Sequence, residues 1–307
     1  MTESVGYLAL QHEGILAVTG PDATRFLQGQ ITNNLNYLTP ELSGLGARCT
    51  AKGRMISSFR VIKRDDNCYW LIIASELLEA QLADLKKYAV FSKVELNEIT
   101  DQWQRYGLLN GFDSLDEAPA TTNRIAAQSQ GFALRLDAQR IEWWLPSNTP
   151  QPDKLTKLEA ISQNDWFAAQ IEAGIGQVFG ATREVFIPQM INLQALDGVS
   201  FRKGCYTGQE IVARMQYLGK LKRRMYRFKV DGVSTPDIGA PIYSPTHSSS
   251  VGEVVLAAQV GDYVELLAVA QEEAVSDQRI TLTPESEQYL QLLALPYTCD
   301  SDREIQR

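Results

Sequence analysis

Residues 201–212 read Phe-Arg-Lys-Gly-Cys-Tyr-Thr-Gly-Gln-Glu-Ile-Val and form the most informative stretch of the chain. Thr207 and Glu210 have the spacing of a capping box, in which a threonine begins a helix and a glutamate three residues later bonds back to it. The sequence therefore predicts a helix that starts at Thr207, with Cys205 on the turn before it. A thiol at the positive end of a helix, two residues from Lys203, is favoured as a thiolate. Cys205 is thus the cysteine predicted to be reactive, although an inert thiol on an ordinary turn has the same pattern.

The basic residues of the chain are concentrated in the same region. From Arg202 to Lys229 there are nine lysines and arginines and one acid, Glu210, which gives a net charge of +8. Because the whole chain carries −8, the remainder carries −16. A basic segment in an acidic protein is typical of a site for a polyanionic ligand or nucleic acid. A solvated edge of a strand and linker explains the charge equally well.

Length and composition set broad limits. A chain of 307 residues, 44% of them hydrophobic, predicts two or three domains with cores that need no disulfide or metal. The N-terminus has neither a basic region nor a long apolar run, and no stretch approaches the roughly 20 apolar residues that cross a bilayer. We therefore expect a soluble cytoplasmic protein.

Several classes of site lack their signatures. The four cysteines do not form a CxxC pair and there are two histidines, so no zinc or iron–sulfur site is predicted. His12 and His247 are poor partners for a catalytic cysteine, since neither lies in a turn-rich motif with an orienting carboxylate. Nucleophile-elbow, dinucleotide-binding and P-loop motifs are missing from the sequence.

Hydrophobic periodicity predicts a mixed α+β protein. Residues 7–19 have an extended pattern, and residues 44–74 have the pattern of paired hairpins. A helix that begins at Ser75 and a strand over 91–99 complete a ββαβ unit. After Met225, short alternating strands separated by turns predict a small antiparallel barrel or sandwich.

The residues Lys203-Gly-Cys-Tyr-Thr-Gly-Gln-Glu210 resemble the signature of the YgfZ-type tRNA-modifying, folate-binding proteins. These are relatives of the glycine-cleavage T-protein, an aminomethyltransferase that uses tetrahydrofolate. Further blocks follow the same pattern in the same order over most of the chain: 85–93 (LKKYAVFSK), Trp166, 171–174 (IEAG), 186–189 (FIPQ) and 192–196 (NLQAL).

The resemblance implies three lobes around a central folate-sized hole. Residues 1–43 and 101–221 would form a discontinuous folate-binding α+β domain. Residues 44–100 would be an inserted ββαβ domain, and 222–307 a C-terminal antiparallel β-barrel.

The resemblance also assigns site residues. Trp166 corresponds to a folate-contacting tryptophan, whose indole can stack on a pterin ring, and a tryptophan packed in the core is the alternative. Glu172 corresponds to a carboxylate that accepts N–H groups of the pterin, and a solvated helix acid is the alternative. Tyr206 and Gln209 are further candidate folate contacts. Cys205 would be the essential functional thiol, with Lys203 beside it.

The chain departs from the family patterns at two places. Its first tryptophan is Trp70, so the N-terminal tryptophan expected near His12 is missing. The T-protein carries an aspartate pair where this chain has Ser57 and Ser58, and serine cannot supply the ionised carboxylate that activates an amine. These departures predict folate binding without glycine-cleavage activity.

The resemblance therefore implies an accessory protein for iron–sulfur enzymes, including the one that methylthiolates tRNA, and more a folate-binding factor than a catalyst. One alternative is a tetrahydrofolate-dependent one-carbon transferase that acts on an unknown acceptor. Another is direct tRNA binding through the basic segment 202–229, for which a folate polyglutamate tail is a rival anion.

Overall fold

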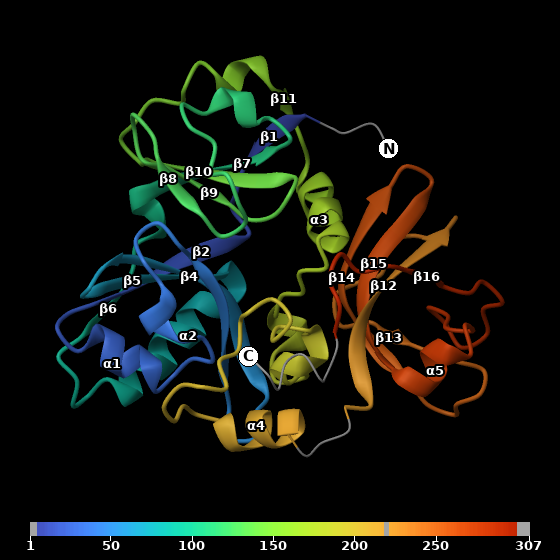
Figure 1. The fold of residues 1–307 in the computed structure, drawn as a ribbon. Helices are drawn as coiled ribbons and strands as arrows, with labels where there is room; N and C mark the ends of the chain where they lie inside the picture. Colours follow the sequence, from blue (N-terminus) through green and yellow to red (C-terminus); the bar gives the residue numbers. More distant parts are fainter. Residues whose placement is uncertain (1–4, 218–220, 300–307) are drawn as a thin grey trace. The chain divides into compact units, whose positions relative to one another are not determined.

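The computed structural model describes residues 5–217 and 221–299. Figure 1 shows the ribbon of the chain, which divides into two compact units by its internal contacts. Unit 1 consists of Met1–Gly29, Asn34–Leu45 and Phe59–Ala169, and unit 2 consists of Gln30–Asn33, Gly46–Ser58 and Gln170–Arg307. The predicted three-domain division has other boundaries and stays a prediction.

A six-stranded sheet in unit 1 has the strand order β11-β1-β7-β10-β9-β8. Neighbouring strands are antiparallel except β1 and β11, which are parallel. Its strands are β1 (Gly6–Ala9), β7 (Trp103–Leu109), β8 (Ile125–Ala127), β9 (Phe132–Arg135), β10 (Arg140–Pro146) and β11 (Glu159–Ala160).

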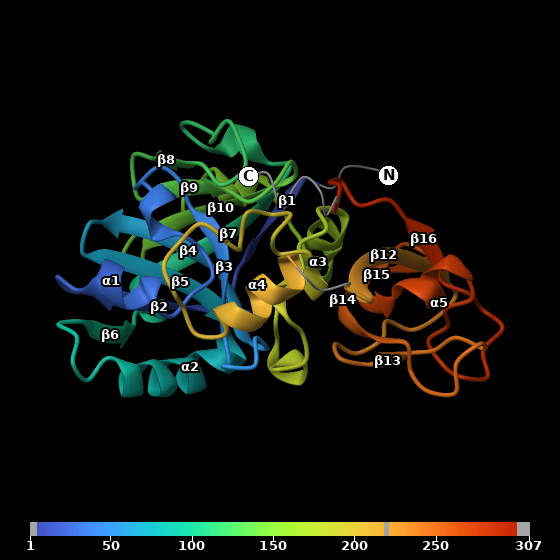
Figure 2. The same cartoon turned by 60° about the horizontal axis from the view of Figure 1, so that its bottom comes forward.

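A second sheet has the order β3-β4-β5-β2-β6. The predicted hairpins and helix are confirmed, and the strand predicted over 91–99 is shorter. The strands of the predicted ββαβ unit share their sheet with β2, which pairs with both β5 and β6. Helix α2 lies along one face of these strands (Figure 2). The elements are β2 (Glu13–Thr19), β3 (Gly44–Cys49), β4 (Met55–Asp65), β5 (Cys68–Ala74), α2 (Ser75–Tyr88) and β6 (Glu95–Glu98).

The C-terminal strands of unit 2 form an open, antiparallel half-barrel in the order β13-β14-β15-β12-β16. The predicted antiparallel β-barrel is therefore confirmed only as a half-barrel, which is not closed in the part of the chain that the structure describes. The edge strands β13 and β16 have two and three residues, too few for a continuous closing ladder. The elements are β12 (Arg223–Asp231), β13 (Pro241–Ile242), β14 (Gly252–Val260), β15 (Tyr263–Gln271), α5 (Glu272–Ser276) and β16 (Gln291–Leu293).

The described residues form a mixed, sheet-rich α+β structure with short 3₁₀ helices between its strands. Its other α-helices are α1 (Ala23–Gln28), α3 (Gln163–Glu172) and α4 (Gln209–Tyr217). Within residues 5–217 and 221–299, no helix is long and apolar enough to span a membrane.

A buried group of charges lies in the core of unit 1. Nη2 of Arg105 donates to Oε2 of Glu13 at 2.8 Å and to Oε1 of Glu142 at 3.0 Å. The guanidinium carbon is 4.7 Å from the centroid of the Trp144 ring, and the indole of Trp144 donates to Oε2 of Glu142 at 2.7 Å. Arg105 and Glu142 are 5% and 3% exposed. Each buried charge is therefore paired, as burial requires.

We expect Arg105→Met to lower the free energy of unfolding by roughly 3–5 kcal/mol, because the carboxylates of the buried Glu142 and the half-buried Glu13 lose the cation of Arg105. Lys154→Met is the matched control: the exposed Lys154–Asp116 pair spans 3.0 Å, and its loss should cost less than about 1 kcal/mol. Urea unfolding measures both. Equal losses in the two variants would contradict a stabilising role for the buried pairs.

Candidate functional site

The motif at 201–212 lies in unit 2 as a loop followed by α4. The helix begins at Gln209, so the predicted start at Thr207 is wrong. Gly208 has a φ of +86°, which a first helical residue cannot adopt. A Cβ on Gly208 would lie 2.4 Å from the carbonyl oxygen of Thr50 and 3.0 Å from Cβ of Cys49. This glycine therefore allows the loop to contact the 49–53 turn closely. Its positive φ prevents the helix from including Gly208, although the spacing of Thr207 and Glu210 is that of a capping box.

The amine of Lys203 connects the loop to a segment far away in the sequence. Its Nζ donates to the carbonyl oxygens of Ile31 at 2.8 Å and Asn33 at 2.6 Å, and lies 5.3 Å from the centroid of the Tyr206 ring. Burial lowers the pKa of Lys203 to about 7. The structure therefore places Lys203 as an internal link of unit 2, and not on a solvated basic surface.

The side chain of Tyr206 points into the interior of unit 2. The residue is 7% exposed, and its hydroxyl is buried without a hydrogen-bond partner. Burial raises the pKa of Tyr206, and so to a smaller extent does the neighbouring Cys49. Burial also raises the pKa of the Cys49 thiol to about 12, so both groups are neutral at physiological pH. Gln209 is half-buried at the first residue of α4. That either residue contacts folate stays a prediction.

Cys205 has a different environment from the other cysteines. Its residue is exposed, whereas Cys49 is buried and Cys68 and Cys299 are half-buried. A Cβ on the preceding Gly204 would meet nothing within 4 Å. The thiol of Cys205 is thus in a position that a partner molecule can reach, which reactivity requires but does not by itself establish.

Part of the predicted basic segment is engaged inside unit 2. Like Lys203, other residues of the segment have partners there: Arg227 pairs with Glu265 at 2.6 Å, Arg223 pairs with Glu253 at 3.5 Å, and Lys229 lies 5.6 Å from the ring centroid of Tyr263. Arg214 and Lys222 are exposed, and Lys220 lies outside the described residues. The charge available to a polyanion is therefore well below the +8 counted in the sequence.

Trp166 lies in the core of unit 1. It is 2% exposed, and the guanidinium carbon of Arg140 is 5.0 Å from its ring centroid. On another side Gly107 makes room for the indole, because a Cβ there would lie 2.7 Å from a ring carbon. His12, near the missing N-terminal tryptophan, packs edge-on against Phe167 with ring centroids 5.1 Å apart. The contacts of Trp166 are those of a core tryptophan, and its contact with folate stays a prediction.

Glu172 is the half-buried last residue of α3 and belongs to unit 2. Its carboxylate helps to raise the pKa of Tyr263, after the larger effects of burial and of Glu265. Trp166 and Glu172 are six residues apart on one helix, which is about 240° around its axis. The two predicted pterin contacts therefore do not share a face of α3.

The two serines in the place of the T-protein aspartates are buried. Ser57 and Ser58 are 0% and 5% exposed, and Oγ of Ser58 accepts a hydrogen bond from the backbone N–H of Val178 at 2.8 Å. Ser58 therefore has a structural hydrogen bond and neither residue carries an ionisable carboxyl group. Within the described part of the chain, no three His, Cys, Asp or Glu side chains are grouped where a metal ion could bind.

The pKa of Lys203 predicts a pH-dependent contribution to stability. The lysine pKa falls from 10.5 to about 7 on folding, so the unfolded state binds more protons between these values. Stability should rise with pH through this window and stop changing below pH 7, where both states are protonated. We therefore compare the free energy of unfolding of the wild type with that of Lys203→Met. The wild-type value minus the variant value should increase between pH 7 and 9.5, by at most about 1.4 kcal/mol per pH unit. Urea unfolding with the exposed Lys86→Met as control checks this, and parallel pH profiles would contradict it.

Comparisons with known proteins agree with this architecture. Residues 1–130 match the family model of the GCVT N-terminal domain. The fold is similar to glycine cleavage system aminomethyltransferase T from Bartonella henselae, with a TM-score of 0.72 and 15% identity over 95% of this chain and 86% of that one. Heterotetrameric sarcosine oxidase from Corynebacterium sp. U-96 is a weaker match, with a TM-score of 0.38 and 12% identity over 53% of this chain and 89% of that one. At 15% identity, the first likeness shows that this chain has the fold of an aminomethyltransferase T-protein.

Proposed function

We propose that this chain binds a folate. The observation that carries the proposal is the fold, which is similar to that of an aminomethyltransferase T-protein over 95% of the chain. The match of residues 1–130 to the GCVT N-terminal domain supports it from the sequence side. Because one fold can host unrelated functions, the proposed function also depends on the chemistry of the residues at the site.

The proposed folate site does not transfer aminomethyl groups from glycine. Ser57 and Ser58 stand where the T-protein pattern has its aspartates, and Ser58 is committed to the N–H of Val178. A reaction that needs an ionised carboxylate at this place has none from these two residues. The site is accordingly proposed to hold a folate without glycine cleavage.

The exposed Cys205 supports the finer proposal, that the chain assists iron–sulfur enzymes, including the enzyme that methylthiolates tRNA. One cysteine cannot hold a cluster alone, so any cluster contact would use a partner protein or a small thiol. The proposal also places the chain in the cytoplasm, where such thiols are kept reduced.

Direct tRNA binding through residues 202–229 has less support. Lys203, Arg223, Arg227 and Lys229 have partners within unit 2, which reduces the charge that could neutralise phosphates. A folate polyglutamate tail needs fewer cations, and the exposed Arg214 and Lys222 remain available to it.

We expect tetrahydrofolate to bind the full chain in calorimetry, and Glu172→Gln to weaken the binding by about tenfold or more, because the neutral amide loses charge-assisted hydrogen bonds to the pterin. The exposed Glu159→Gln is the matched control and should bind as the wild type does. Trp166→Phe separates a stacking role from a core role, since a core role changes the unfolding midpoint and leaves the affinity unchanged. Absence of tetrahydrofolate binding to the wild type would overturn the proposed function.

We expect Cys205→Ser to fail to restore tRNA methylthiolation in a strain that lacks this protein, because serine keeps the size of the thiol and loses its nucleophilicity and metal affinity. Cys68→Ser is the control, since this half-buried thiol is placed in β5 and has no proposed role. The methylthiolated nucleoside is measured by mass spectrometry of digested tRNA. Full restoration by Cys205→Ser would remove the thiol from the proposed function.

A further inference from the structure

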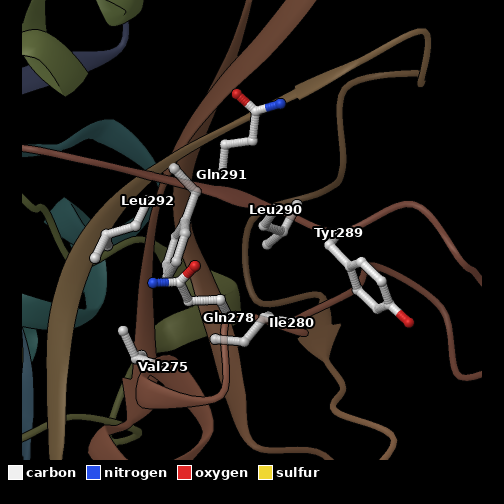
Figure 3. A pocket seen from close by; sticks show the side chains of 8 residues that line it. Val275, Gln278, Ile280, Tyr289, Leu290, Gln291 and Leu292 are labelled. Carbon is white, nitrogen blue, oxygen red and sulfur yellow. The ribbon is translucent and has the colours of Figure 1, made fainter.

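The C-terminal half-barrel of unit 2 contains a pocket of about 380 Å³, which lies within the range of small-ligand and side-chain pockets. Its lining comes from the end of α5 and the residues after it, from β12, and from the segment that leads into β16 (Figure 3). The floor consists of four apolar side chains that are all at most 8% exposed: Phe228, Val275, Ile280 and Leu290.

The rim of the pocket is exposed. Tyr289 and Leu292 are 40% and 49% exposed, although both are large and apolar enough to belong to a core. Gln278 adds an exposed amide group and has a φ of +53°, an uncommon conformation for a residue other than glycine. An apolar floor with an aromatic, an aliphatic and an amide group at its mouth suits one bulky apolar group and polar atoms beside it.

The pocket lies beside an edge strand. In the half-barrel, β16 is the last strand and pairs with β12. Leu292 stands opposite Phe228, and Gln291 stands opposite Lys229. Because side chains alternate along a strand, Leu292 and Phe228 share the pocket face and Lys229 points to the other face of the sheet. An added strand at this edge would direct every second side chain toward the pocket.

The segment that supplies most of the pocket lining is acidic. Residues 272–292 contain five acids and one base, a net charge of −4 in a chain of −8. All six charged side chains are exposed: Glu272, Glu273, Asp277, Arg279, Glu285 and Glu287. These exposed acids are called the acidic rim, and they attract a basic partner and repel an acidic one.

We propose that this pocket and the β16 edge form a docking surface, the β16 surface, for an extended basic peptide segment of a partner protein. One bulky apolar side chain of the peptide fills the pocket between Phe228 and Leu292, while lysines or arginines on either side meet the acidic rim. Main-chain pairing with β16 fixes the direction of the segment. The surface is independent of the proposed folate site, and its test needs no folate.

The chain's own C-terminal residues suit the surface less well than a basic peptide does. Residues 300–307 contain three acids and two arginines. Their excess of negative charge opposes an acidic rim, whereas a lysine-rich segment complements it. The test below nevertheless includes these residues as an occupant.

The test measures fluorescence anisotropy of a labelled seven-residue peptide in which two lysines precede and two follow a valine-phenylalanine-valine centre, so that the phenylalanine and one lysine on either side of it share a face. With the full chain we expect a dissociation constant of roughly 10–100 µM, because β16 offers few main-chain bonds. Leu292→Asp at the rim should weaken binding by about tenfold or more. Val90→Asp is the matched control, since Val90 is 70% exposed and lies in unit 1, and it should change nothing. The joint variant Glu285→Gln and Glu287→Gln should weaken binding and reduce its dependence on salt.

Two altered peptides complete the test. Replacing the central phenylalanine by alanine should abolish measurable binding if the pocket is filled, and replacing the lysines by glutamates should do the same if the rim charge matters. No binding of the lysine peptide, equal binding of the glutamate peptide, or unchanged binding to Leu292→Asp would overturn the proposal. A chain that ends at Cys299 should bind as the full chain does. Binding that appears only after this truncation would assign the surface to the chain's own end and would also overturn it.

Discussion

The two hydrogen bonds from Lys203 to the carbonyl oxygens of Ile31 and Asn33 set the geometry of the motif region. They join positions that are 172 and 170 residues apart and hold the loop before α4 against the segment 30–33. Gly208 extends this attachment, because its missing side chain allows contact with the carbonyl of Thr50. Lys203 and Gly208 are thus both anchored, one on either side of Cys205. Between them, Tyr206 is directed into the interior and Cys205 remains at the surface. The accessibility of the thiol is thus a consequence of where the rest of the motif is anchored.

The burial of the Lys203 amine has a second consequence. Burial removes water from the ammonium group, and its two carbonyl partners do not fully replace that water. The charged form is therefore disfavoured, which lowers the pKa of Lys203. A cation in this position contributes little to a field that would attract tRNA or a folate tail. Arg227 and Arg223, paired with Glu265 and Glu253, reduce the field further. Charge counted along the sequence therefore overestimates the charge presented to a ligand, because pairing and burial are decided by the fold.

The sequence allowed the mixed α+β class, the hairpins of 44–74 and helix α2 to be predicted, because each depends on local periodicity and turn residues. It missed that the extended stretch 7–19 is two strands, β1 and β2, which lie in different sheets. The predicted start of α4 was wrong for a similar reason. A capping box is a local signal, whereas the conformation of Gly208 depends on its close contact with Thr50, which is far away in the sequence. Nothing local marked Arg105 as the centre of a buried charge group, since its partners Glu13 and Glu142 are far away in the chain.

For this protein, the sequence by itself determined which residue types are present at the motif, the acidic balance of the chain and the serines at 57 and 58. Through the resemblance to folate-binding relatives of the T-protein, the motif and the two serines motivate the proposal of folate binding without glycine cleavage. Only the tertiary structure decided that Trp166 is enclosed by Arg140 and Gly107, that Lys203 faces inward and Cys205 outward, and that the half-barrel stays open beside β16. The physical reason is that burial, pairing and pKa depend on neighbours brought together by folding, and the spacing of residues along a chain does not specify those neighbours.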